Sequence, residues 1–292
     1  DWDLAFQGFD IFTNGGVSGG GKGSAFGPLD ALQFLEDGPP DVPFMTSDQA
    51  GGAFLKWYAY DSNGHVLYSR FHVYGVKSGS SLFKVQILTY YAVQNGAATS
   101  GLYQIRYADI TSGQGKEHDL TIDGTAGGVS GPATAPSGCL DLASGNVTML
   151  APADAATSTA WDLCFRRETV SVNGEVGGPR GVGAIDLEAS AVATEVLSDV
   201  EAETADGEKV VFDDADASAF TNAQFRGDHV VSAFESGGWL DSAQSPPEPV
   251  QKSWVVQDAG GTKKFLVGFD AFQNPTTQSP GTVVMHIKPV GG

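Results

Sequence analysis

Histidine side chains are the residues of this chain best suited to bind a metal ion or a metal-bearing cofactor. There are five of them: His65, His72, His118, His229 and His286. None has a partner at a ligand-like spacing such as H-x-x-x-H. His65 follows Asn63-Gly64 in a predicted turn, whose tip could present a neutral imidazole to haem iron. The alternative for His65 is an exposed turn histidine with no ligand.

Further residues could complete a cofactor site. Met45 could supply a thioether ligand to haem iron, or it packs in a core. Trp57, Tyr58 and Tyr60 could line a flat apolar pocket suited to a porphyrin. The alternative for these aromatic residues is a place in the core, because Trp57 matches Trp239 in a second copy of the same pattern described below.

The acidic residues show no arrangement in the sequence that indicates catalysis. Asp213, Asp214 and Asp216 stand close enough together to offer oxygen ligands to calcium, but the turn glycine and final glutamate of an EF-hand loop are missing. The alternative is a solvated acidic loop. Because no catalytic arrangement of side chains stands out, we expect a protein that is not an enzyme.

The elements that must position these residues are predicted to be β-strands. Only 17% of the residues are charged, and 39 are glycine, with turn-forming residues between short apolar runs. The clearest strands run over residues 71–76, 82–91 and 102–107. In the second, apolar residues alternate with others as in a half-buried strand, with Phe83, Val85 and Ile87 on one face and Lys84, Gln86 and Leu88 on the other. The sequence predicts an antiparallel all-β protein.

The charge of the chain excludes some partners. Asp and Glu number 35 against 16 Lys and Arg, which gives a formal net charge of −19. Binding to nucleic acid or to an anionic membrane needs a basic face, so we expect neither. No apolar run approaches the roughly 18 residues that a transmembrane helix needs, so we expect no transmembrane helix.

The chain contains an internal repeat. Trp2-Asp3-Leu4-Ala5-Phe6 recurs 159 residues later as Trp161-Asp162-Leu163-Cys164-Phe165, and Trp57 and Phe83 recur 182 residues later as Trp239 and Phe265. The difference is a 23-residue insertion in the second copy, in or near the acidic residues 186–216. We therefore predict two tandem β domains, at 1–112 and 138–292, joined by a Gly, Thr, Ala, Pro and Ser-rich linker at 113–137. Since a plausible strand at 138–142 precedes the second copy, the repeat also predicts a strand upstream of Asp1.

Several short motifs occur in an order that suggests a family. These motifs are Trp2-Asp3-Leu4-Ala5-Phe6 with Asn14-Gly15-Gly16, then Trp57-Tyr58-Ala59-Tyr60, and then Phe83-Lys84-Val85-Gln86-Ile87 with Tyr90-Tyr91. The series resembles the HmuY family of haem-binding proteins, over residues 1–110 well and over 138–290 more faintly. No histidine stands between Asn14 and Trp57, where the family would place its first iron ligand.

The resemblance implies two HmuY-like β domains that hold haem between hairpin fingers. It also implies a protein exported by a Gram-negative bacterium to the outer-membrane surface, the periplasm or the medium, as a lipoprotein anchored upstream of Asp1 or as a secreted haemophore for iron acquisition. The residues expected to bind haem are His65, as iron ligand, with Met45, Trp57, Tyr58 and Tyr60. The alternative function is a cell-surface structural or protein-interaction module that keeps the fold without a ligand, and that has a protein partner.

The two cysteines are predicted to form a disulfide. Cys139 and Cys164 stand on strands that should be close neighbours at the start of the second copy. An exported protein favours the bridge, and closing a loop of about 25 residues would contribute roughly 3 kcal/mol. The alternative is two buried free thiols.

Overall fold

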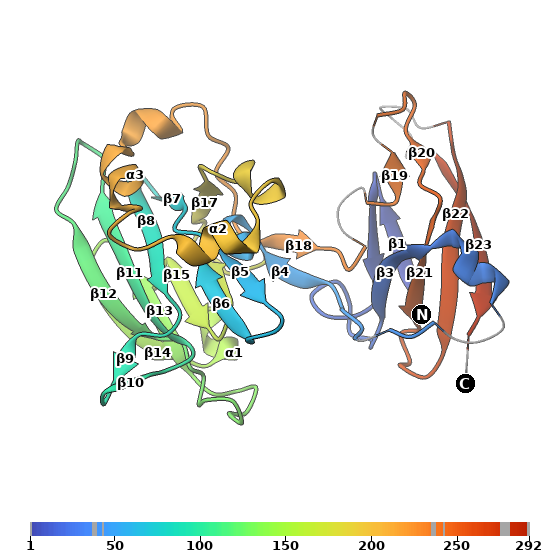
Figure 1. Ribbon diagram of the computed structural model, residues 1–292, viewed down its shortest axis with the longest axis horizontal. Helices are drawn as coiled ribbons and strands as arrows, with labels where there is room; N and C mark the ends of the chain where they lie inside the picture. Colours follow the sequence, from blue (N-terminus) through green and yellow to red (C-terminus); the bar gives the residue numbers. More distant parts are fainter. Residues whose placement is uncertain are drawn as a thin grey trace. The chain divides into compact units, whose positions relative to one another are not determined.

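The computed structural model describes residues 2–36, 40–42, 44–234, 238–241, 243–274 and 281–290. The chain forms two compact units: unit 1 consists of Asp1–Ala50 with Val230–Gly292, and unit 2 is the continuous segment Gly51–His229. Both units are built from antiparallel strands (Figure 1), so the predicted all-β class is confirmed.

Unit 2 contains two sheets that share one core. The first has the strand order β12 (His118–Asp123), β11 (Leu102–Asp109), β8 (Ser81–Thr89), β7 (Val73–Ser78) and β17 (Gly183–Asp186). The second has the order β14 (Asn146–Leu150), β13 (Ser137–Asp141), β15 (Leu163–Arg166) and β16 (Thr169–Val172). Apolar side chains from both sheets, such as Val85 and Ile105 from the first and Leu140 and Phe165 from the second, form a single buried cluster.

Short elements complete unit 2. Two hairpins pair β5 (Tyr58–Asp61) with β6 (Val66–Ser69) and β9 (Val93–Gln94) with β10 (Ala97–Ala98). The helical segments are α1 (Pro152–Ala155), α2 (Leu197–Ala202), α3 (Lys209–Asp214), η2 (Ala53–Lys56), η3 (Ala191–Ala193) and η4 (Ala217–Phe220). Three of them, η3, α2 and α3, lie in the predicted acidic insertion, which therefore carries helix rather than a bare solvated loop.

Unit 1 has one four-stranded sheet, in the order β23 (Thr282–Pro289), β22 (Lys264–Gln273), β21 (Lys252–Gln257) and β3 (Ser24–Asp30). Two hairpins pair β1 (Leu4–Gln7) with β2 (Asp10–Thr13) and β19 (Leu240–Asp241) with β20 (Glu248–Pro249), and η1 (Ala31–Leu35) follows β3. Where the chain passes between the units, β4 (Gln49–Gly51) pairs with β18 (His229–Val231).

The three strands predicted most clearly are confirmed as β7, β8 and β11 with slightly shifted ends. The outer face of β8, however, is not solvated as its polar residues suggested, because Lys84 and Gln86 are both buried. Helix α3 lies over this face (Figure 1), and Phe212 packs there against Val73 and Ala108. The Lys84 ammonium donates to the Phe212 carbonyl (2.6 Å) near the end of α3, where carbonyls need donors.

The internal repeat is visible in the strands. Strands β1, β2 and β3 each have a counterpart 159 residues later, in β15, β16 and β17. The indole N–H of Trp57 donates to the Glu168 carbonyl (2.8 Å), and that of Trp239 donates to the Phe9 carbonyl (2.6 Å), so the repeat extends to single hydrogen bonds. The ladders β8–β11 and β22–β23 also carry a bulge at matching positions, Leu88 and Asp270.

Each unit joins half of one repeat copy to half of the other. The first fifty residues of copy one pack with the end of copy two in unit 1, while residues 51–112 pack with the start of copy two in unit 2. The expected tandem arrangement of two HmuY-like domains is therefore not confirmed. Residues 113–137, expected as a linker, include β12, which pairs along β11. We call this arrangement the half-exchange.

Candidate functional site

The β5–β6 hairpin carries three of the predicted site residues, Tyr58, Tyr60 and His65. Its turn is fixed by Asp61, whose carboxylate accepts the backbone N–H groups of Asn63 (2.8 Å) and Gly64 (2.8 Å), as Asp commonly does in a turn. His65 follows with a left-handed backbone (φ 56°) and an exposed side chain. The sequence motif Asn63-Gly64-His65 therefore does place an imidazole at a turn tip.

The imidazole of His65 is held by a neighbouring phenol. The Nδ1 atom of His65 and the hydroxyl of Tyr60 are hydrogen-bonded at 2.8 Å. Tyr60 is exposed on the same hairpin. The pair leaves Nε2 of His65 as the ring nitrogen that can meet a ligand.

A cavity of about 350 Å³ opens beside this hairpin. Tyr58 and Tyr60 lie on its β5 wall, Lys56 comes from η2, and Arg70 follows β6. The opposite side is formed by 195–197, at the start of α2. Burial raises the pKa of the Tyr58 phenol, so this side chain stays neutral at ordinary pH. The lining of the cavity thus combines two tyrosine rings with the cations Lys56 and Arg70 and the carboxylate of Glu195.

A buried network of charged groups stands behind the cavity. Arg70 pairs with Glu195, and its Nε donates to the Tyr58 carbonyl (3.2 Å). His72 lies between two carboxylates, with Nδ1 2.9 Å from Asp186 and Nε2 2.9 Å from Glu195. Because a carboxylate oxygen lies against each ring nitrogen of His72, neither nitrogen is open to a further ligand.

The remaining predicted haem residues lie elsewhere. Trp57 is buried in the core of unit 2, against Tyr58 and Tyr103. It therefore has the core position that was the alternative to a place in a porphyrin pocket. Met45 is half-buried and belongs to unit 1, whereas the hairpin belongs to unit 2. The structure thus places Tyr58 and Tyr60 in the lining of the hairpin cavity, whereas His65 contacts Tyr60 from the turn and, like Trp57, is not part of the lining.

The acidic residues expected to offer calcium ligands point to separate partners. Asp213 pairs with Lys209 (2.7 Å), and Asp216 accepts the backbone N–H of Ser218 (2.8 Å). Across the described ranges, no group of three His, Cys, Asp or Glu side chains is arranged to hold a metal ion. Calcium binding at this loop has no geometric support.

The sequence analysis missed two buried carboxylates, Asp48 and Asp228, that accept from residues at matching positions of the repeat, Thr13 and Val172. Asp48 accepts the backbone N–H of Thr13 (2.9 Å), the Thr13 hydroxyl (3.1 Å) and the N–H of Ala233 (3.0 Å). Asp228 accepts the N–H of Val172 (3.0 Å), but its Oδ1 has no hydrogen-bond partner. Burial raises the pKa of the Asp228 carboxyl to about 7. Aligning Thr13 with Val172 by the repeat would have shown that Asp228 lacks the threonine hydroxyl that Asp48 accepts.

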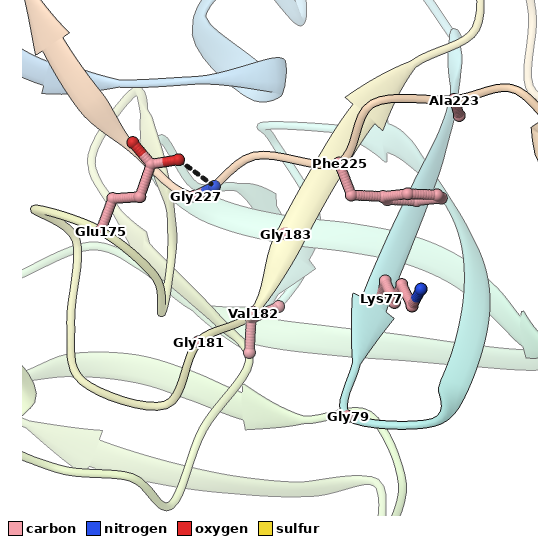
Figure 2. Close-up of a pocket in the computed structure, with 9 residues that line it drawn as sticks. All are labelled: Lys77, Gly79, Glu175, Gly181, Val182, Gly183, Ala223, Phe225 and Gly227. Carbon is pink, nitrogen blue, oxygen red and sulfur yellow. Dashed lines mark hydrogen bonds between the residues drawn. The ribbon is translucent and has the colours of Figure 1, made fainter.

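A second cavity, of about 420 Å³, opens next to Asp228 at Gly227 (Figure 2). Figure 2 shows Glu175 turned to Gly227, whose N–H it accepts at 3.2 Å. Glu175 also pairs with Arg226 (3.0 Å), and the Lys77 ammonium lies 6.0 Å from the centre of the Phe225 ring. Glu175 is thus engaged with the protein itself, and Lys77 supplies the cation of the lining.

The predicted disulfide is confirmed. Cys139 of β13 and Cys164 of β15 are directly opposite in the sheet and are bonded to each other. The expectation from the repeat that these two strands are neighbours is also correct.

The chain matches no protein-family model, no curated protein and no solved structure, so the resemblance to the HmuY family stays a prediction. No helix in the described part of the chain is long and apolar enough to cross a bilayer.

Proposed function

We propose that this chain is a non-catalytic binding protein that captures haem, or a related porphyrin, at the β5–β6 hairpin. The observation that carries the proposal is the hydrogen bond between His65 Nδ1 and the Tyr60 hydroxyl (2.8 Å). With the proton on Nδ1, His65 donates to the Tyr60 oxygen, and Nε2 keeps the lone pair that ligates iron. Histidines that bind metals are almost always oriented by such a second hydrogen bond.

The cavity beside the hairpin supports the same ligand class. Its volume of about 350 Å³ lies at the lower end of ligand pockets, and tyrosine rings form one wall. Lys56 and Arg70 also line it. Because Arg70 is already paired with Glu195, the Lys56 ammonium is the cation that a porphyrin carboxylate would meet. A local cation matters because the chain as a whole carries a net charge of −19.

The proposed setting is outside the cytoplasm. The Cys139–Cys164 disulfide supports an oxidising compartment, where such bonds form and persist. Together with the HmuY resemblance, we infer an exported protein at the outer-membrane surface, in the periplasm or in the medium of a Gram-negative bacterium, with a role in iron acquisition.

A haemin titration of the purified chain, followed in the Soret region, tests the proposal. We expect a saturable, red-shifted band at one haem per chain, which His65→Ala abolishes and Tyr60→Phe weakens roughly 10–100-fold. His118→Ala is the matched control, because His118 is also exposed in unit 2 but stacks on Tyr107. No saturable band, or equal binding by the His65→Ala variant, would refute haem binding at this hairpin.

The second candidate is a surface structural or protein-interaction module that keeps the fold without a ligand. The burial of Trp57 in the core favours it, because this removes the largest aromatic residue from the cavity lining. A chain with no haem-dependent spectrum would support this candidate.

A further inference from the structure

The cavity at Gly227 lies where a lysine side chain of unit 1 has no counterpart in unit 2. The chain before β17 repeats the chain before β3 at the offset of 159, so Gly181 stands where unit 1 has Lys22. In unit 1 the Lys22 side chain lies against Gly261, so closely that a Cβ atom at Gly261 would come within 2.8 Å of it. A Cβ atom at Gly181 would meet nothing within 4 Å. Gly181 therefore leaves space in the cavity that it lines.

The hairpin beside this cavity is also shorter than its counterpart. In β17, Gly183 pairs with Lys77 of β7. Its counterpart Ser24 pairs with Gln257 of β21, so Lys77 stands where unit 1 has that glutamine. Four residues link Lys77 to its partner Leu82 in β8, whereas six link Gln257 to its partner in β22. The hairpin of unit 2 is therefore two residues shorter and offers less chain to cover the cavity.

Two hydrogen-bond donors that are engaged in unit 1 are available in unit 2. The Gln257 amide donates to the Lys22 carbonyl (3.1 Å), and the Lys22 N–H donates to the Ala259 carbonyl (2.8 Å). Among the residues that the structure describes, no hydrogen bond or ion pair engages the Lys77 ammonium or the Gly181 N–H at the matching places. The cavity therefore holds an ammonium and a backbone donor that the fold itself does not use.

The lining of the cavity has one charge that no partner balances. Figure 2 shows Lys77 beside the Phe225 ring, with the Glu175 carboxylate away from them at Gly227. The Lys77 ammonium is 6.0 Å from the centre of that ring. Because Glu175 pairs with Arg226 (3.0 Å), its negative charge is balanced within the protein. The ammonium of Lys77 is therefore the charge that an anionic ligand would meet.

Phe225 presents an aromatic face that its neighbours hold in place. It packs on β17 at Gly183, where a Cβ atom would come within 2.9 Å of the Phe225 Cβ. Its ring is 6.2 Å from the buried Phe220 ring, which in turn packs on Gly75 of β7 so closely that a methyl group there would clash with it. The two glycines thus let both rings reach the sheet. A half-buried ring fixed in this way can stack on a ligand with little further loss of freedom.

We propose that this cavity binds a small aromatic carboxylate. The ammonium of Lys77 and the ring of Phe225 lie close enough for one ligand, with a carboxylate attached to a flat ring, to reach both. The carboxylate accepts from the ammonium at about 2.8 Å, and the ligand ring stacks offset on Phe225. The Gly181 N–H is a second donor to the carboxylate. The volume of about 420 Å³ lies within the range of small-molecule pockets.

This inference does not depend on haem capture. No residue of this lining belongs to the lining of the hairpin cavity. Lys77→Met should leave the Soret titration unchanged, and His65→Ala should leave the binding of the aromatic carboxylate unchanged. Either site can fail while the other is retained.

The test titrates the full chain with 2-naphthoate, whose fluorescence reports its binding. We expect saturable one-to-one binding. At the same concentrations we expect none with 2-naphthamide, which has the ring without the charge, or with acetate, which has the charge without the ring. Amide NMR shifts should change at 181–183 and 225–227 and not at 58–69. Equal binding of 2-naphthamide, or shifts centred on 58–69, would overturn the proposal.

Three variants locate the site. Lys77→Met keeps the length of an exposed side chain and removes its charge, so it should weaken 2-naphthoate binding at least about tenfold. Phe225→Leu should weaken it about 2–10-fold, through the lost ring stacking. Lys116→Met is the matched control, because Lys116 is an exposed lysine of unit 2 outside this lining, and it should bind like the original chain. Unchanged binding by Lys77→Met, or an equal loss in Lys116→Met, would refute binding in this cavity.

Discussion

The raised pKa of Asp228 makes the stability of unit 2 depend on pH in the direction opposite to that of a salt-bridged carboxylate. Its pKa in the folded chain is about 7, and an unfolded aspartate titrates near about 3.9. Folding therefore favours the protonated form. The contribution of the Asp228 carboxyl to the free energy of unfolding is full below about pH 4 and is lost as the pH rises to about 7. The difference of about three pH units between the two pKa values corresponds to about 4 kcal/mol.

Asp228→Asn removes the titrating group and keeps an oxygen that can accept the Val172 N–H. We expect this variant to match the original chain at pH 4 and to exceed it at pH 8 by up to about 4 kcal/mol of unfolding free energy. Val172→Thr acts on the same carboxyl by supplying the hydroxyl donor that Thr13 gives to Asp48. It should stabilise unit 2 at pH 8 by about 1.5–3 kcal/mol, as a hydrogen bond to a charged group does.

Urea unfolding at pH 4 and pH 8 measures these effects. The two units can unfold in separate transitions, and that of unit 2 is the one that a reductant shifts, because the Cys139–Cys164 bond lies there. Thr13→Val is the matched control, which should lower the other transition at pH 8. If Asp228→Asn changes stability equally at both pH values, or lowers it at pH 8, the reasoning about the buried carboxyl is wrong.

Three further predictions concern the framework. Replacing Cys139 and Cys164 by serine should lower the unfolding free energy of unit 2 by roughly 3 kcal/mol, and an unchanged urea midpoint would contradict this value. Lys84→Met leaves carbonyls at the end of α3 without their donor, so we expect a loss of about 1–3 kcal/mol and faster proteolysis within residues 187–221; an unaltered cleavage rate would argue against it. Trp57→Phe should lower the reductant-sensitive transition, and Trp239→Phe the other one, each by about 1–3 kcal/mol for the lost indole hydrogen bond. If instead Trp239→Phe lowered the reductant-sensitive transition and Trp57→Phe lowered the other one, the chain would have the tandem arrangement in place of the half-exchange.

Local pattern was sufficient to predict much of the framework. The alternation of Phe83, Val85 and Ile87 identified β8 because a strand buries alternate side chains, and all three lie in the core. Cys164 is the fourth residue of the repeated segment Trp161–Phe165. The repeat placed it beside the strand that carries Cys139, and this led to the disulfide.

Long-range pairing was beyond what these patterns could show. Trp57 and Trp239 occupy matching positions in the sequence. That match does not show whether each indole binds the turn of its own copy or the turn of the other copy. The burial of Lys84 and Gln86 depends on a helix formed more than a hundred residues later, so the period of β8 alone predicted a solvated face.

The candidate site was partly accessible from sequence. The turn at Asn63-Gly64 predicted an exposed His65, but its hydrogen bond to Tyr60 depends on the side-chain geometry of the finished hairpin. The buried Asp228 gave no local signal, because one aspartate among 35 acidic residues is ordinary in sequence. Only its comparison with Asp48 shows that the threonine hydroxyl at the position of Thr13 has no counterpart at Val172.

The half-exchange also sets an order for folding during synthesis. Unit 2 is one continuous segment, so it can fold once residue 229 has left the ribosome. Unit 1 needs β3 from the beginning of the chain and β21 to β23 from its end. The first fifty residues must therefore wait, without their sheet partners, while the whole of unit 2 is made. This places Leu4 and Ile11, which pack in the core of unit 1, among the last apolar residues of the chain to be covered, so this segment has the most to gain from protection by a chaperone.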